Sequence, residues 1–305
     1  MFKNLITYRV FTNSGHLQEL SAASISEAIN PQQFCPCQPG QPRAVGWVSP
    51  RGAEHSELAE FFGSHILLRL KSESKIIPAA TVKKRTEELI DAVERTTGRK
   101  PGKKRCKELK EQAILDLLPK AFTRESATNV WIDPAAGLLH IDAGSFKVAD
   151  EVASLLVRAV DGLSILPLHT NQSPSQLMAD WLLSGDPPAA FNVDRECELK
   201  STDEMKSVVR YGRHPLDIEE VHTHISQGKR PTRLALTWMG RVSFVLTDTG
   251  TLKKLDFLDG VFEGQAAKDS GDEFDADAAI TTGELSRMFV DLVTALGGMS
   301  SEGDA

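Results

Sequence analysis

The densest cluster of chemically active side chains in this sequence is cationic. Between Lys83 and Lys110, eleven Lys or Arg residues stand against five acids, so this window carries a formal charge of +6 in a chain whose net charge is −7. Five of the seven residues from Arg99 to Arg105 are cations. Such a local excess attracts polyanions, of which a nucleic-acid backbone is one. The window therefore predicts an anion-binding element on an otherwise acidic chain, and a merely solvated helical hairpin is the alternative.

Two thinner basic stretches follow, at 206–214 and 229–233. Cations that contact phosphates hold a duplex without reading its bases. Aromatic side chains are sparse in all three stretches, which favours contacts to a duplex backbone over stacking on unpaired bases, although single-stranded DNA stays open as a ligand. No recognition helix is evident, so little sequence preference is expected. The candidate DNA-binding residues are Lys83, Lys84, Arg85, Arg99, Lys100, Lys103, Lys104, Arg105, Lys107, Arg210 and Arg213.

Signatures of catalysis are missing from the sequence. It contains neither the glycine-rich phosphate loop, nor the dinucleotide-binding glycine pattern, nor a nucleophile elbow. Cys35 and Cys37 have no second pair at zinc spacing, and tetrahedral zinc needs four converging ligands. We therefore expect no enzyme, no catalytic residue, no metal site and no cofactor.

One acidic segment offers an enzymatic alternative. Carboxylates can hold the divalent ions of a nuclease, and five of them crowd residues 269–277, which we interpret as a loop around Gly271. They are Asp269, Asp272, Glu273, Asp275 and Asp277. A solvated loop, or an acidic counterweight to the basic window, is the simpler interpretation.

Helical periodicity explains how the basic window is held. Apolar residues recur at helical spacing over Ala79–Thr97 and again over Lys103–Leu118. Gly98 ends the first helix, Pro101-Gly102 makes the turn, and Pro119 ends the second. The pattern predicts an αα-hairpin whose charged tip is pushed away from the rest of the chain.

The remaining elements indicate an α+β fold with antiparallel sheets and flanking helices. Short strands joined by tight turns are expected near Leu5–Phe11, Val130–Ile141 and Leu234–Phe257, and a closing helix is expected over Thr282–Leu296. In order along the sequence, we divide the chain into an N-terminal α/β part of a central region (1–78), the basic hairpin (79–118), the rest of the central region (119–190) and a C-terminal α+β region (191–305).

No run of about 18 apolar residues and no apolar signal segment is present, and four cysteines make no disulfide framework. We expect a reduced, cytoplasmic protein without membrane contact.

Short motifs along the whole chain resemble a known family. They are Phe2-Lys3-Asn4-Leu5 with Tyr8-Arg9, Gly46-Trp47-Val48-Ser49-Pro50, Lys75-Ile76-Ile77-Pro78, Leu117-Leu118-Pro119-Lys120-Ala121-Phe122-Thr123-Arg124, Trp131-Ile132-Asp133, Thr232-Arg233-Leu234-Ala235-Leu236-Thr237-Trp238, Leu252-Lys253-Lys254-Leu255, Phe274-Asp275-Ala276-Asp277 and Thr282-Gly283-Glu284-Leu285. In number and order they resemble the bacterial recombination-associated protein RdgC family.

This resemblance implies a homodimer closed into a ring that encircles double-stranded DNA, associates with the nucleoid and restrains the RecA recombinase by occupying DNA. It also implies that Phe122 lies at a dimer interface, whereas an ordinary core position is the alternative for a Phe. A regulator that contacts the recombinase directly is a further alternative to DNA binding.

Overall fold

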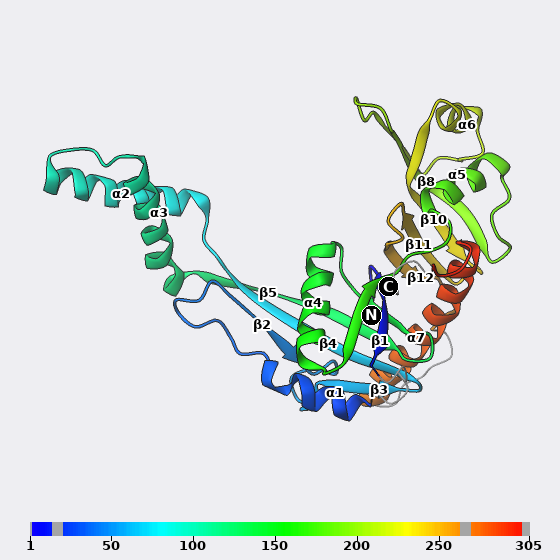
Figure 1. Ribbon diagram of the computed structural model, residues 1–305, viewed down its shortest axis with the longest axis horizontal. Helices are drawn as coiled ribbons and strands as arrows, with labels where there is room; N and C mark the ends of the chain where they lie inside the picture. The colour runs from blue at the N-terminus through cyan, green and yellow to red at the C-terminus, as the bar shows by residue number, and fades with distance from the viewer. Residues whose placement is uncertain (1, 14–20, 263–269, 301–305) are drawn as a thin grey trace. The chain divides into compact units, whose positions relative to one another are not determined.

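The computed structural model describes residues 2–13, 21–262 and 270–300 (Figure 1). The chain forms two compact units, and neither is a continuous segment. The larger unit contains residues 1–29, 49–68 and 129–305, and the smaller unit contains residues 30–48 and 69–128. Two long strands, β4 (His65–Ile76) and β5 (Phe122–Asp133), contribute residues to both units.

The first sheet of the larger unit is antiparallel, and its N-terminal strand lies next to one edge. In it, β1 (Ile6–Thr12) pairs with β6 (Leu138–Ile141) on one side and with β7 (Leu163–Pro167) on the other. The end of β5 forms a tight hairpin with β6, and β3 (Ala59–Phe62) pairs with the start of β4. Helices α1 (Ala22–Ile29) and α4 (Phe146–Ala159) complete this half of the unit.

The second sheet of the larger unit has five antiparallel strands in the order β12-β11-β10-β8-β9. Their bounds are β8 (Phe191–Ser201), β9 (Val208–Gly212), β10 (Lys229–Trp238), β11 (Val242–Thr247) and β12 (Leu252–Phe257). Helices α5 (Pro174–Ser184) and α6 (Glu219–Ser226) contact each other and β10. Helix α7 (Ser270–Ala295) closes the unit.

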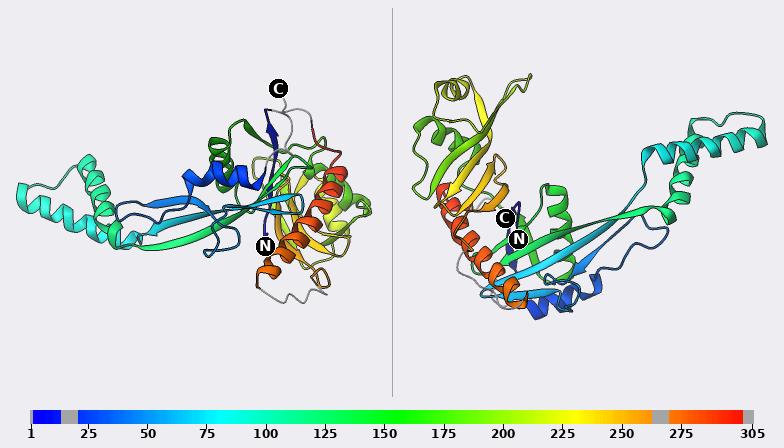
Figure 2. Two further views of the ribbon diagram at one scale, coloured as in Figure 1. Left: turned by 90° about the horizontal axis from the view of Figure 1, so that it is seen from below. Right: turned by 180° about the vertical axis from the view of Figure 1, so that it is seen from behind.

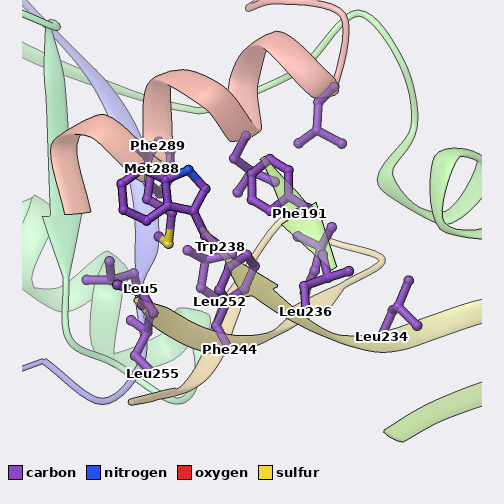
Figure 3. Close-up of a cluster of buried hydrophobic side chains, with 14 of the residues drawn as sticks. Leu5, Phe191, Leu234, Leu236, Trp238, Phe244, Leu252, Leu255, Met288 and Phe289 are labelled. Atoms are coloured by element: carbon purple, nitrogen blue, oxygen red, sulfur yellow. The ribbon is translucent and has the colours of Figure 1, made fainter. Parts of the chain in front are cut away.

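The main core of the larger unit lies beneath α7, where side chains of the second sheet meet those of the helix (Figure 3). Trp238, Met288 and Phe289 are each almost fully buried there. Leu5 joins this core because its backbone pairs with Leu252, with N–H···O distances of 2.8 and 3.0 Å in the two directions. The N-terminal segment thereby links the first sheet to the edge of the second.

The smaller unit consists of three strand segments, two α-helices and two short 3₁₀ helices, η2 (Asn30–Gln32) and η3 (Leu118–Lys120). In its sheet, β2 (Arg43–Val48) pairs antiparallel with the second half of β4, and the first half of β5 follows as the next strand. Helices α2 (Ala79–Thr97) and α3 (Lys103–Leu117) lie between β4 and β5 in the chain and cross each other, as both views in Figure 2 show. The apolar contact between them is short: Val82, Leu109 and Ala113 are buried, whereas Leu89 and Val93 are half-buried.

The structure confirms the α+β class with antiparallel sheets, and it places helices at both segments of the basic window. It corrects several boundaries. The closing helix begins at Ser270 instead of Thr282, and β5 begins at Phe122 instead of near Val130. The first six residues of β5 are all exposed, so they lack the alternation of apolar and polar residues by which a strand is recognised. Within the described ranges, no helix is long and apolar enough to cross a membrane.

Candidate nucleic-acid interface

The nine candidate cations of the basic window lie on α2, on α3 and on the connection between these helices. Lys83, Lys84 and Arg85 lie in the first two turns of α2. Arg99 and Lys100 lie in the connection, which begins at Gly98 in the left-handed conformation (φ 68°). The other four, Lys103, Lys104, Arg105 and Lys107, lie in the first turns of α3. All nine are exposed except Arg85, which is half-buried.

Intramolecular acids neutralise some of these cations. Arg85 contacts Asp116 on α3, with an Nη2–Oδ2 distance of 2.7 Å, and it also contacts Glu88 at 3.2 Å. The hydrogen bonds to Asp116 and then to Glu88 raise the pKa of Arg85 above its ordinary value. Arg105 lies 2.8 Å from Glu108, and Lys83 lies 3.9 Å from Glu87. Arg85 therefore ties α2 to α3 and is a weaker candidate for contacts to DNA than its neighbours.

Other cations of the window have no acidic partner in the part of the chain that the structure describes. These cations are Lys84, Arg99, Lys100, Lys103, Lys104 and Lys107. Helix α3 has no acid in its first turn, and Gly102 at its N-cap supplies no capping side chain. The exposed N–H groups and the positive end of the helix dipole thus add to the side-chain charges. Arg99, Lys100, Lys103 and Lys104 form a concentrated positive surface, which we call the connection cluster.

Arg210 and Arg213 belong to the larger unit and form a separate group. Arg210 is exposed on β9, and its Nε lies 2.6 Å from Oε2 of Glu198 on β8. This hydrogen bond, with a second from Thr232, holds the pKa of the Glu198 carboxyl below its usual range. Arg213 follows β9 and has positive φ (57°). The candidate cations therefore lie in two groups, one in each unit.

Phe122 is the first residue of β5, and 87% of its surface is exposed. Its burial in the core of this chain, the alternative given above, is therefore wrong. Ile76, at the end of β4, is a second large apolar side chain exposed in the smaller unit. A large exposed aromatic ring is unfavourable in water, so Phe122 stays a candidate for an interface.

The acidic segment is not the loop that we expected. Its residues from Ser270 onward form the start of α7, and Asp269 lies outside the described residues. Asp275 pairs with Arg51 on another part of the larger unit, at 2.6 Å, while Asp277 is exposed. Acidic side chains are favourable in the first turns of a helix because they face the positive end of its dipole, and this explains why a run of carboxylates can begin a helix. Among the described residues, no three His, Cys, Asp or Glu side chains converge as metal ligands would.

Comparison with known proteins places this chain in a family. A family model described as "Putative exonuclease, RdgC" matches residues 1–299. The chain belongs to the RdgC family.

Relatives named "Recombination-associated protein RdgC" resemble the chain over nearly its full length. The protein from Dechloromonas aromatica is 42% identical over 302 residues, covering 97% of each chain. The one from Janthinobacterium sp. is 43% identical over 299 residues, covering 97% of this chain and 98% of the relative. That of Cupriavidus pinatubonensis is 46% identical over 281 residues, covering 91% and 93%. The resemblance found in the sequence motifs is thus confirmed, and RdgC relatives match both units.

Proposed function

We propose that this chain is a non-enzymatic protein of DNA recombination that binds double-stranded DNA through its phosphates and with little sequence preference. The connection cluster is the observation that carries the proposal. Its four cations are exposed and lack acidic partners within the described residues, so they are available to an external polyanion. The name of the relatives, which refers to recombination, supports DNA as that polyanion.

We further propose that the protein acts as a homodimer closed into a ring around the duplex. A two-fold axis would duplicate each group of cations, so that both copies contribute to a single positive channel. The exposed ring of Phe122 is our candidate for a contact that closes this ring, because buried aromatic anchors contribute strongly to interfaces. By occupying DNA, such a ring restrains the RecA recombinase, and we expect the protein to associate with the nucleoid.

Salt dependence of duplex binding tests the proposal. Anisotropy titrations with two duplexes of unrelated sequence should give similar affinities, and the logarithm of affinity should fall steeply as the logarithm of salt concentration rises. If about six cations of one copy of the chain each neutralise a phosphate, that copy contributes about −5 to the slope. Binding that is indifferent to salt would contradict the proposal.

The double variant Lys103→Gln/Lys104→Gln assigns binding to the connection cluster. We expect it to make the slope shallower by about 2 for each copy of the chain that contacts the duplex, since each phosphate contact contributes about 0.9. The double variant Lys147→Gln/Arg158→Gln is the matched control, because it removes the same charge from two exposed positions of α4. Equal effects of the two variants would show that only the overall charge matters.

Two further measurements separate the alternatives. Incubation of DNA with the protein and Mg²⁺ or Mn²⁺ tests for a nuclease, and we expect the DNA to stay intact. Inhibition of RecA-promoted strand exchange, measured on the Lys103→Gln/Lys104→Gln variant, tests for direct contact with the recombinase. Full inhibition by a variant that no longer binds DNA would favour the direct contact.

A further inference from the structure

A second group of cations forms where β8, β9 and β10 pair at one end of the second sheet. Lys200 on β8 lies opposite Val208 on β9 and opposite Arg230 on β10. Two residues earlier on β8, Glu198 lies opposite Arg210 on β9 and opposite Arg233 on β10. The pairing thus places Lys200, Arg210, Arg230 and Arg233 on one face of three adjacent strands, and we call them the sheet-face cluster.

A β-bulge brings Arg230 and Arg233 to the same face. Residues three apart in a regular strand point to opposite faces, because side chains alternate with a period of two. The register of β10 against β8 shifts between Pro231 and Arg233, and Thr232 is the inserted residue. Pro231 and Leu234 are buried whereas Arg230 and Arg233 are exposed, in agreement with this shift.

The opposite face of these strands is covered. Cys197 and Leu199 of β8 are buried and lie opposite Leu234 and Pro231 of β10. The side chains of α5 and α6 belong to the same core, and both helices contact β10 (Figure 1). The sheet-face cluster therefore lies on the solvent-exposed face of a sheet whose other face packs against α5 and α6.

The charges of this face are unbalanced. Glu198 is the single carboxylate in the two rows, and it contacts Nε of Arg210 at 2.6 Å and the hydroxyl of Thr232 at 2.7 Å. Since hydrogen bonding by Arg210 lowers the pKa of Glu198, this group is ionised at neutral pH. Four cations against one carboxylate leave a charge of about +3 in these two rows, on strands spaced about 4.8 Å apart. Glu196, in the next row of β8, is paired with Lys254 at 2.7 Å. The Arg230 guanidinium also donates to Gln176 in the first turn of α5 at 2.9 Å, so this side chain lies at the end of the sheet, beside that helix.

We infer that the sheet-face cluster binds phosphates of duplex DNA as a contact surface separate from the connection cluster. This inference rests on the proposed function. Guanidinium groups suit phosphate geometry because their N–H donors form a planar fork. Tyr211, the aromatic residue of β9, lies opposite Cys197 and thus on the covered face. The cluster therefore presents charge without a stacking ring, and this favours a duplex backbone over unpaired bases.

The experiment compares matched double variants of the full chain. Lys200→Gln/Arg230→Gln removes one Lys and one Arg from the sheet-face cluster, and Lys147→Gln/Arg158→Gln removes the same two types from α4. Anisotropy titrations with a fluorescent 30-base-pair duplex, over a range of salt concentrations, give the slope for each variant. We expect the sheet-face variant to make the slope shallower by about 2 for each copy of the chain that contacts the duplex, and the control to leave it nearly unchanged. Adding Arg233→Gln should remove about one further unit for each copy.

A charge change of opposite sign strengthens the test. Glu198→Gln keeps an oxygen for the Thr232 hydroxyl but removes the one negative charge of these two rows, so we expect tighter duplex binding. If the parent chain binds no duplex at any salt concentration, the proposed function fails, and this inference fails with it. If the parent binds while the sheet-face variant matches the α4 control and Glu198→Gln has no effect, this inference alone is overturned. Melting temperatures of all variants identify any loss of affinity that comes from unfolding.

Discussion

Arg85 on α2 donates two hydrogen bonds to one carboxylate oxygen of Asp116 on α3, from Nε at 3.2 Å and from Nη2 at 2.7 Å. These residues lie 31 positions apart in the chain, and their ion pair bridges two helices that share few buried side chains. The basic window thus contains cations with different tasks: Arg85 holds the helices together, whereas the connection cluster is available to a ligand.

Substitution of Arg85 should therefore change the stability of the fold more than it changes the salt dependence of DNA binding. We expect Arg85→Gln to lower the melting temperature, but by less than Leu109→Ala, which removes a buried side chain at a cost of about 3 kcal/mol. For this variant, the slope of the logarithm of duplex affinity against the logarithm of salt concentration should stay close to that of the parent chain. A slope that falls as it does for Lys103→Gln/Lys104→Gln would show instead that Arg85 contacts phosphate.

Removal of the exposed aromatic ring should affect assembly. We expect Phe122→Ala to leave the melting temperature within about 1 °C of the parent when both are measured as monomers, because surface substitutions change stability little. In sedimentation velocity at rising concentration, the variant should dimerise more weakly and hold duplex less tightly. Phe61→Ala is the control, since Phe61 on β3 is also exposed (53%). Equal dimerisation by the two variants would remove Phe122 from the interface.

A buried histidine makes the fold sensitive to acid. His140 stacks on Trp131 with ring centroids 4.2 Å apart, and burial lowers its pKa to about 3. Below pH 6.5 the unfolded chain gains a proton that the folded chain does not accept, so folded-state stability falls as the pH falls. Between pH 7 and pH 5 this loss is about 2 kcal/mol.

Urea unfolding at the two pH values measures this effect. His140→Gln should lose about 2 kcal/mol less than the parent between pH 7 and pH 5, whatever its stability at pH 7. Burial also lowers the pKa of His65, but that residue is present in both chains and cancels in the comparison. Identical acid losses in the two chains would contradict the assignment.

Position 46 on β2 requires a glycine because the backbone of residues 32–34 passes close to it. A Cβ atom at this position would overlap the Cα of Phe34 and lie 2.8 Å from the carbonyl oxygen of Gln32. The approach is fixed because the N–H of Phe34 donates to the carbonyl oxygen of Trp47 at 2.9 Å. We expect Gly46→Ala to cost about 2 kcal/mol or more in the free energy of unfolding. Gly40→Ala, where a Cβ meets no atom within 4 Å, should be nearly neutral in the same measurement.

Local patterns in the sequence were sufficient for the elements that depend on neighbouring residues. The two helices of the basic window follow from apolar spacing and from breakers at Gly98, Pro101 and Pro119, so α2 was predicted with its observed bounds. Family membership also followed from the order of short motifs. The exposed half of β5 and the acidic start of α7 were missed, since their residues lack the periodicity that burial imposes.

Charge composition alone identified which segments are basic, but not which cations are free to bind. That was decided by tertiary contacts between residues far apart in the chain, such as the contact of Arg85 with Asp116. Lys200 was not among the sequence candidates because its cationic neighbour Arg230 is on another strand. Likewise, only strand pairing reveals the Thr232 bulge that turns Arg230 and Arg233 to one face, because register depends on hydrogen bonds between strands and not on the spacing within one.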